Sequence, residues 1–170
     1  MMLESERLIL RRFTNKDIDA LFAHRSDSEV MVHLGGVQKR NMVVARVETY
    51  NNYFDAHGYA MCAMIWKKTG EFIGVGGLQQ LFDDGEVEVG YTLEKEFWGR
   101  GIATECTLAC LHFGFTKAAL ETIGAQTSSR NMVSLRVLEK CGFTIEGETV
   151  QFGEKWFRLK ITKQTWKRRV

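Results

Sequence analysis

The chain contains 170 residues, 45% of them hydrophobic, which is enough to bury a substantial core within a single domain spanning residues 1–170. Its 23 basic and 21 acidic residues are interspersed along the chain and leave a net charge of +2. This balance disfavours a nucleic-acid partner, which would need a basic stripe interleaved with aromatic side chains, and suits an anionic small molecule better.

The ends of the chain and its cysteines narrow the class of protein further. The first residues show no basic segment leading into an apolar one, and no apolar run approaches the length of a membrane span. We therefore expect a cytoplasmic protein without a membrane partner. The 4 cysteines form no C-x-x-C pair and the 4 histidines are scattered, so we expect ordinary thiols and no metal site.

The first half of the chain predicts a strand and two helices, followed by three strands. A Thr14 or Asn15 cap before apolar residues at helical spacing predicts the first helix, and Gly58 ends the second. Turn signals, including Asp83–Asp84–Gly85, divide the following strands into an antiparallel meander. The expected elements are a strand at 8–13, a helix from the cap to about residue 24, a helix at 42–57, and strands at 59–66, 72–81 and 87–93.

The second half predicts two helices that alternate with strands. A long apolar helix follows the meander, and this crossover allows the next strand to lie parallel to the one before it. A shorter helix ends at Gly142, which suits a left-handed terminal position. The expected elements are helices at 103–117 and 132–140 and strands at 122–127, 143–150 and 156–166. The chain therefore predicts a mixed α/β fold with a mostly antiparallel sheet.

The stretch from Phe97 to Glu105 joins a strand to a helix and contains two glycines, Gly99 and Gly101. Such a pair lets successive backbone N–H groups turn toward one point. The following helix directs its positive dipole end and its unpaired first-turn N–H groups to the same place. This arrangement predicts a phosphate site. The alternative is an ordinary glycine-containing turn before a buried helix.

Two motifs together resemble the GNAT superfamily of acyl-CoA N-acyltransferases. Residues 98–103, which begin with Trp98 in place of Gln or Arg, resemble its Q/R-x-x-G-x-G/A cofactor signature, and residues 131–143 resemble its N-x-x-S-x-x-v-x-e-K-x-G-F segment. Stretches at 6–11, 87–91 and 104–105 resemble the RimJ and RimL branch of ribosomal-protein N-acetyltransferases. The similarity covers essentially the whole chain. It implies a GNAT-like α/β (α+β) fold, a mostly antiparallel central sheet splayed between two parallel strands, with helices on both faces.

The resemblance implies acetyl-CoA as co-substrate and no metal. The pyrophosphate would lie on the backbone of residues 99–104, and the pantetheine arm would pass between the strand ending near Leu93 and the strand at 122–127. Asn131 would bond the pantetheine, although an asparagine here also suits a plain helix cap. The residues expected to contact the cofactor are Val89, Trp98, Gly99, Arg100, Gly101, Ile102, Ala103, Thr104, Asn131 and Ser134.

Acyl transfer to an amine needs a base for the ammonium proton, a donor for the developing oxyanion and an acid for the thiolate. The resemblance implies Glu88 as the base, acting through water, with Glu86 on the same strand face as second choice. The alternative is that both carboxylates only face solvent. The oxyanion donor would be the backbone N–H of Val89 or Gly90.

The acid is where this chain departs from the family pattern. Leu138 occupies the helix position at which many GNAT enzymes carry a tyrosine. In the RimJ/RimL-like branch the serine of N-x-x-S is the replacement, which implies Ser134, unless that serine is only a first-turn helix residue. Tyr91 is a further candidate, although an aromatic residue beside a glycine in a strand also fits plain packing.

These inferences predict an N-acetyltransferase that moves an acetyl group from acetyl-CoA to a primary amine by direct attack in a ternary complex. The acceptor would be a protein or peptide N-terminus or a small-molecule amine, bound near residues 30–40 and 152–156, and the protein would be a monomer or a homodimer. An alternative is an acyl-CoA-binding sensor or interaction module without turnover. The missing lysine after the glycines disfavours a nucleotide hydrolase, and the preceding meander disfavours a Rossmann site.

Overall fold

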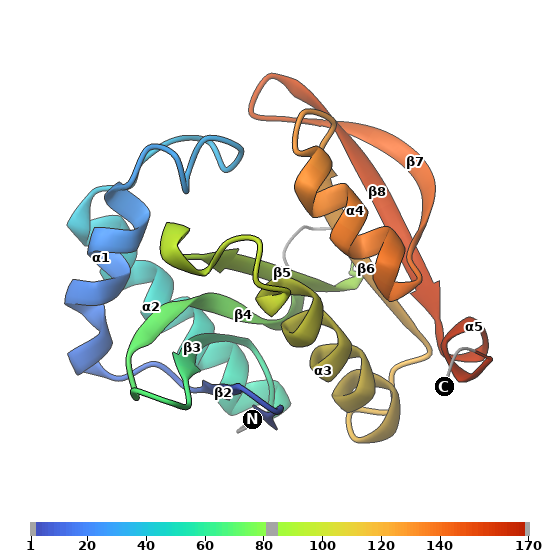
Figure 1. Ribbon diagram of the computed structural model, residues 1–170, viewed down its shortest axis with the longest axis horizontal. Coiled ribbons are helices and arrows are strands. Elements are labelled where there is room, and N and C mark those ends of the chain that lie inside the picture. Colours follow the sequence, from blue (N-terminus) through green and yellow to red (C-terminus); the bar gives the residue numbers. More distant parts are fainter. Residues whose placement is uncertain (1–2, 81–84, 169–170) are drawn as a thin grey trace.

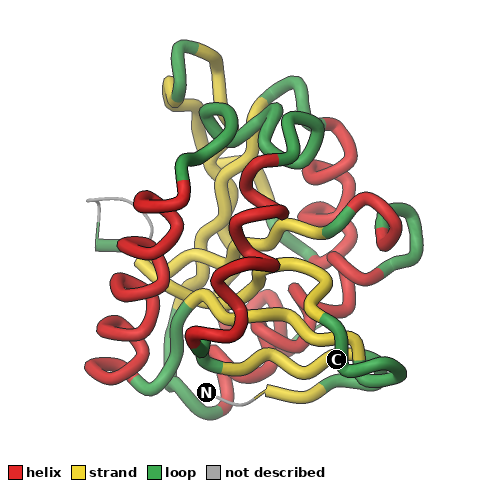
Figure 2. Tube along the Cα trace, turned by 90° about the vertical axis from the view of Figure 1, so that its left-hand side faces the viewer, coloured by secondary structure: helices red, strands yellow, loops and turns green. Residues whose placement is uncertain are grey.

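The computed structural model describes residues 3–80 and 85–168, in which an eight-stranded sheet carries helices on both faces (Figure 1, Figure 2). The strand order is β1-β2-β3-β4-β5-β6-β8-β7. The strands are β1 (Leu3–Glu4), β2 (Leu8–Arg11), β3 (Met61–Trp66), β4 (Phe72–Gln80), β5 (Val87–Leu93), β6 (Thr122–Ser128), β7 (Thr144–Gln151) and β8 (Glu154–Thr162). The helices are α1 (Ile18–Ser26), α2 (Arg40–His57), α3 (Ile102–Thr116), α4 (Met132–Cys141) and α5 (Lys163–Lys167).

The described strand pairs are antiparallel except for β5 and β6, which run parallel. These two strands share one ladder position, Glu88 opposite Gly124. By contrast, β5 pairs with β4 along its whole length, from Val87 to Leu93. The mostly antiparallel sheet, splayed between two parallel strands, is therefore confirmed.

Alternation along the strands produces an apolar core on each face of the sheet. On one face, Val89 and Ile123 of the sheet pack with Cys106 of α3. On the other, Val43 and Val47 of α2 pack over β3 and β4. The helices thus lie on both faces, as predicted.

The end of the last strand differs from the prediction. The strand β8 ends at Thr162 and residues 163–167 form α5, so the prediction of a strand through residue 166 is wrong over residues 163–166. The cause is a capping box, in which the Thr162 hydroxyl accepts a hydrogen bond from the Thr165 backbone N–H (3.1 Å). At its other end, β8 begins at Glu154, so the hairpin turn before it is shorter than predicted.

Smaller differences lie in the first half. The first predicted strand ends at Arg11, and the two-residue strand β1, which the sequence analysis missed, pairs with it. The helix α2 begins at Arg40 and ends, as predicted, before Gly58, which has a φ of +76°. Leu81 and the predicted Asp83–Asp84 turn lie outside the described residues. Among the helices of the described chain, none is long and apolar enough to cross a bilayer.

Candidate active site

The turn before α3 is shaped by Gly99 and Gly101, whose φ angles of +71° and +76° lie in the left-handed region. A side chain at either position would strain this conformation, which is why the turn needs two glycines. Gly101 is the N-cap of α3, so the unpaired first-turn N–H groups of a 15-residue helix point toward the turn. Ile102, only 1% exposed, anchors that helix end in the core. The turn can therefore present backbone donors and a positive dipole end to an anion.

Trp98 holds this turn against the end of β5. Its indole Nε1–H donates to the Leu93 carbonyl (2.9 Å), while 47% of the residue stays exposed. Arg100 lies in the turn with its guanidinium 5.2 Å from the centre of the Phe97 ring. The replacement of Gln or Arg by Trp98 therefore leaves the backbone of the turn intact, and Arg100 keeps a positive charge beside it.

The N-terminal arm fixes the turn through Arg7 and Glu105, a pairing that the sequence analysis missed. Glu105 accepts hydrogen bonds from the Ser5 hydroxyl (2.6 Å), the Arg7 backbone N–H (2.7 Å) and Arg7 Nε (2.6 Å). Arg7 Nη1 also donates to the Arg100 carbonyl (3.0 Å). Burial acts to raise the pKa of Glu105, but these hydrogen bonds outweigh it and hold that pKa below its ordinary value. No spacing rule connects residues 98 positions apart.

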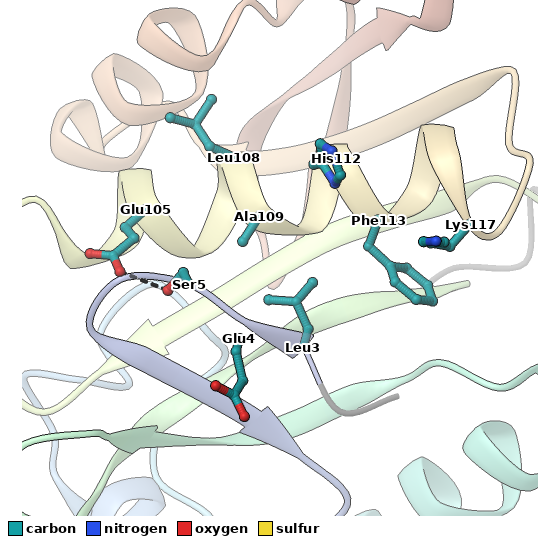
Figure 3. Close-up of a pocket in the computed structure, with 9 residues that line it drawn as sticks. All are labelled: Leu3, Glu4, Ser5, Glu105, Leu108, Ala109, His112, Phe113 and Lys117. Atoms are coloured by element: carbon teal, nitrogen blue, oxygen red, sulfur yellow. Dashed lines mark hydrogen bonds between the residues drawn. The ribbon is translucent and has the colours of Figure 1, made fainter.

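A hollow of about 430 Å³ lies beside this contact, between β1 and α3 (Figure 3). Figure 3 shows Leu3 facing Ala109 and Phe113 across it, with the Ser5–Glu105 hydrogen bond at one end. The hollow is lined by residues 3–5, by side chains of α3 and by Lys117 just after α3. No residue of β5, β6 or α4 lines it. It is therefore separate from the opening between the parallel strands.

The α4 end of that opening carries Asn131, Ser134 and Tyr91. Asn131 Oδ1 accepts a hydrogen bond from the Ser134 backbone N–H (3.1 Å), so the helix-cap interpretation of Asn131 is confirmed. The cap uses the amide oxygen, which leaves the amide nitrogen as the group that Asn131 can offer to a ligand. The Tyr91 hydroxyl lies 3.0 Å from Ser134 Oγ.

This contact connects the two candidate acids. The sequence analysis treated Tyr91 mainly as a packing residue, but its hydroxyl reaches the serine of α4. Burial raises the pKa of Tyr91 well above its ordinary value, so the phenol keeps its proton. Leu138 is 2% exposed and buried in the core, so it offers no hydroxyl in place of the usual tyrosine.

Glu88 is buried where β5 and β6 part. The residue is 2% exposed, and its Oε1 accepts a hydrogen bond from Gln126 Nε2 of β6 (2.8 Å). Gly124 makes room for it, since a Cβ at that glycine would lie 3.2 Å from both Glu88 Cγ and Glu86 Cδ. The two glutamates therefore share a face of the sheet, as predicted, and the alternative that Glu88 only faces solvent is wrong.

Glu86 has charged partners on β8. It makes an ion pair with Lys160 Nζ (2.8 Å) and lies 3.9 Å from Arg158 Nη2, both on β8. Its hydrogen bond raises the pKa of Lys160, despite the opposing effect of desolvation. Glu86 is thus engaged by two cations of β8, which makes it the weaker candidate for the base.

The two predicted acceptor regions meet in space. A Cβ at Gly35, in the segment between α1 and α2, would lie 2.7 Å from the Phe152 ring at the tip of the β7–β8 hairpin. The Phe152 ring in turn stacks edge-on to Trp156, with ring centres 5.8 Å apart. The structure therefore brings residues 30–40 and 152–156 together.

A second hollow, of about 460 Å³, lies between α2 and β4. It is lined by Met42, Ala45, Arg46, Thr49, Tyr50, Gln79 and Gln80. Gln79 is the ladder partner of Glu88 in the neighbouring strand, so the hollow lies one strand away from the buried carboxylate. The sequence could not predict this hollow, because α2 and β4 carry no motif that indicates their contact.

The sequence predicted no metal site and only ordinary thiols. Within residues 3–80 and 85–168 no group of three or more His, Cys, Asp or Glu side chains could hold a metal ion. The four cysteines are buried free thiols, and burial raises the pKa of Cys62 to about 12. They are therefore ordinary core residues, as predicted.

Residues 7–144 match the family model described as acetyltransferase (GNAT) domain. Among curated proteins, the uncharacterized N-acetyltransferase YoaA of Bacillus subtilis is 30% identical over 154 residues, which cover 89% of this chain and 87% of that protein. A GNAT-family acetyltransferase from Bacillus anthracis superposes with a TM-score of 0.83 at 26% identity, over 96% of this chain and 99% of that one.

Two more distant structures share the fold. Spermidine N-acetyltransferase from Vibrio cholerae, solved with CoA and spermine, has a TM-score of 0.79 at 19% identity, over 95% of this chain and 99% of that one. RimL, a ribosomal L7/L12 α-N-protein acetyltransferase, has a TM-score of 0.80 at 16% identity, over 95% of this chain and 94% of that one.

Proposed function

Since this chain belongs to the acetyltransferase (GNAT) family and is an acetyl-CoA-dependent acyltransferase, we propose that it acetylates a primary amine by direct attack in a ternary complex. The observation that carries the proposal is the position of Glu88. Its carboxylate is buried at the one ladder position that β5 and β6 share, beside the point where they part. A carboxylate there can take the proton that an ammonium group must lose before it attacks.

The acetyl-CoA site would be formed by the turn before α3 and the opening between β5 and β6. Backbone N–H groups of residues 99–104, from Gly99 to Thr104, would hold the pyrophosphate, with Arg100 adding a charge-assisted contact. The pantetheine arm would lie along the strand edges, and the Asn131 amide would donate to it. The residues fit this co-substrate, because glycines keep the turn clear of side chains and because the strands part where an extended arm would enter.

Residues of the chain would then accept the proton of the amine and donate a proton to the sulfur. Glu88, held by Gln126, would accept the amine proton through a water molecule as the N–C bond forms. The backbone N–H of Val89 would stabilise the oxyanion. As the C–S bond breaks, the Ser134 hydroxyl would donate a proton to the departing sulfur and take one from the Tyr91 hydroxyl, 3.0 Å away, which would be reprotonated in turn from solvent.

The acceptor would bind where residues 30–40 meet residues 152–156. The motif resemblance and the shared fold support a RimJ/RimL-like enzyme acting on a protein α-amino group, while the shared fold with a spermidine N-acetyltransferase equally supports a small-molecule amine. Both acceptors present a primary amine to the same base.

Ligand binding tests the cofactor assignment first. Thermal unfolding of the protein is measured alone and with acetyl-CoA, CoA or ATP at equal concentrations. A ligand at 100 times its dissociation constant stabilises the folded state by about 2.7 kcal/mol, so both CoA species should raise the midpoint and ATP should not. No shift with either CoA species at millimolar concentration contradicts the proposal.

Release of the CoA thiol in the presence of an amine panel then tests turnover. An amine-dependent increase in free thiol, with acetylated amine found by mass spectrometry, is the expected result. Binding of acetyl-CoA without turnover of any amine, including an N-terminal peptide and spermidine, would favour the sensor alternative.

A further inference from the structure

The described chain leaves five buried side-chain atoms without a hydrogen-bond partner. They are Arg25 Nε, Gln38 Oε1, Arg46 Nε, Gln126 Oε1 and Trp156 Nε1. None belongs to the turn before α3 or to α4. They come from α1, the segment after it, α2, β6 and β8, the elements around Glu88 and the acceptor regions. Buried polar groups in a folded protein are normally satisfied, so a set gathered around one site points to a missing ligand.

The two arginines are the most informative members. Arg25 is only 5% exposed, and its Nη1 donates to the thioether sulfur of Met31 (3.5 Å), a weak acceptor. Burial lowers the pKa of Arg25, the positive charge of Arg46 acts in the same direction, and the Tyr50 hydroxyl opposes it. Arg25 is thus a buried cation, and the half-buried Arg46, whose Nε is covered, is a like charge near it.

Some other arginines have carboxylate partners at distances of up to 3.9 Å: Arg7, Arg11, Arg12, Arg40, Arg130 and Arg158. In the described residues neither Arg25 nor Arg46 has one. A buried cation is costly unless an anion compensates it, and the planar guanidinium fork matches a carboxylate with two parallel hydrogen bonds. Arg25 therefore calls for an anion that the described residues do not supply, and Arg46 lies beside it.

The place for this anion is the hollow between α2 and β4. Arg46 and Tyr50 form one wall, and Gln79 forms another. Its volume of about 460 Å³ lies within the usual range for small-molecule sites. Because Gln79 is the ladder partner of Glu88, an anion here would lie within one small molecule's reach of an amine at the base.

We propose that the acceptor is a small amino acid in the broad sense, an amine that also bears a carboxylate, and that Arg46, supported by Arg25, binds that carboxylate. Its amine end would lie at Glu88 and Gln126. This proposal rests on the proposed function, since it uses the same base, and it narrows the acceptor from any primary amine to one with two oppositely charged ends.

Matched amine pairs test the proposal. Each pair is an amino acid and its neutral carboxamide: glycine, β-alanine, γ-aminobutyrate, methionine and glutamine. We expect at least one acid to be acetylated with a kcat/KM at least tenfold above that of its amide. Phosphoethanolamine is included beside β-alanine, and a preference for the phosphate compound would overturn the carboxylate assignment.

The variant Arg46→Gln connects this preference to the hollow, with Arg12→Gln as a control, since Arg12 is exposed and pairs with Asp55. Arg46→Gln should bring the ratio of kcat/KM for the acid to kcat/KM for the amide close to one. Arg46→Lys should retain part of the wild-type preference for the acid, and Arg12→Gln should retain all of that preference. A ratio below twofold for every pair in the wild type, or an equal loss on acid and amide in Arg46→Gln, overturns the proposal.

A binding measurement covers the case in which no compound is turned over. With CoA present, each amino acid at 10 mM should raise the unfolding midpoint of the wild type but not of Arg46→Gln, and its amide should not. Absence of both the turnover ratio and this shift overturns the carboxylate proposal. Failure of CoA itself to stabilise the protein contradicts the proposed function instead, so the two failures are distinguishable.

Discussion

The two faces of the sheet offer different kinds of groups for ligand binding. On the α3 face the pyrophosphate and pantetheine sites consist mainly of backbone: a turn of left-handed glycines, a helix end and the edges of two parting strands. On the opposite face the proposed acceptor site consists of side chains: a buried glutamate, a pair of arginines and several amides. Within the described residues, the five buried side-chain atoms without partners all come from outside α3, α4 and the turn before α3.

This difference separates what is generic in the molecule from what is particular. Backbone donors can bind a phosphate in any chain that forms this turn, whereas an arginine pair in a hollow selects a ligand of one charge and size. The cofactor and the acceptor should therefore respond to different mutations. Substitutions that affect one face and leave the other unchanged test this separation.

The largest expected effect is on the acceptor face. Glu88→Gln keeps the hydrogen-bonding shape but removes the base, so kcat/KM for the amine should fall by about 10² to 10⁴. The affinity for CoA, measured by titration calorimetry, should stay within about twofold, because the glutamine keeps the packing. Glu121→Gln, an exposed glutamate paired with Lys163, is the control and should leave both values unchanged. Equal activity of Glu88→Gln and wild type would remove Glu88 from the mechanism.

The next effect lies on the cofactor face. Gly101→Ala forces a Cβ into a backbone with a φ of +76°, at a cost of about 1 to 2 kcal/mol, and distorts the N-cap of α3. We expect the dissociation constant of CoA to rise about tenfold while the acid-to-amide preference stays unchanged. Gly70→Ala, at a φ of +77° in the turn between β3 and β4 and away from both proposed sites, controls for strain alone. A change in acceptor preference with no loss of CoA affinity would contradict the separation of the cofactor site and the acceptor site between the two faces.

A smaller effect is expected at the candidate acid, which lies on the α3 face. Ser134→Ala and Tyr91→Phe each remove one hydroxyl of a pair 3.0 Å apart, so each should lower kcat by about three- to tenfold. The double variant should be no worse than the more damaging single one, because one proton route serves both. Additive losses in this cycle, measured with saturating acetyl-CoA, would show that the two hydroxyls act independently.

The α3 face could be predicted from the sequence, because its determinants are local. Two glycines one residue apart and a cap three residues before Ser134 are short-range patterns that dictate backbone shape wherever they occur. The same holds for the meander strands and for α2. One error arose where a contact between separate segments decided the outcome, at β1, which forms by pairing with β2. The other, at α5, was a local threonine cap that went unrecognised in a strand-like run.

The acceptor face could be predicted only in outline. Glu88 was placed on the right strand face by alternation, but its burial depends on Gly124 and Gln126, which come from a strand more than thirty residues later. Arg25 and Arg46 carry no pattern at all, since their significance is the absence of a carboxylate nearby. The lack of a carboxylate among the described residues near these arginines can be recognised only in the folded structure.

The smallest expected effect concerns Arg7, which holds the cofactor turn from outside it. Arg7→Gln removes an ion pair to Glu105 of 2.6 Å and the bond to the Arg100 carbonyl, and should lower the free energy of unfolding by about 1 kcal/mol at neutral pH. Because the folded-state pKa of Glu105 lies below its ordinary value of 4.5, the stability it contributes is present above that pH and is lost as the pH falls further. The difference between wild type and Arg7→Gln, followed by urea unfolding across this range, should therefore shrink in acid. For Arg12→Gln, whose partners are both largely exposed, the difference should be small at every pH. A difference for Arg7→Gln that stays constant into acid would mean that Arg7 acts through packing on Trp66, 5.7 Å from its guanidinium, and that the turn on the α3 face does not depend on this charge pair.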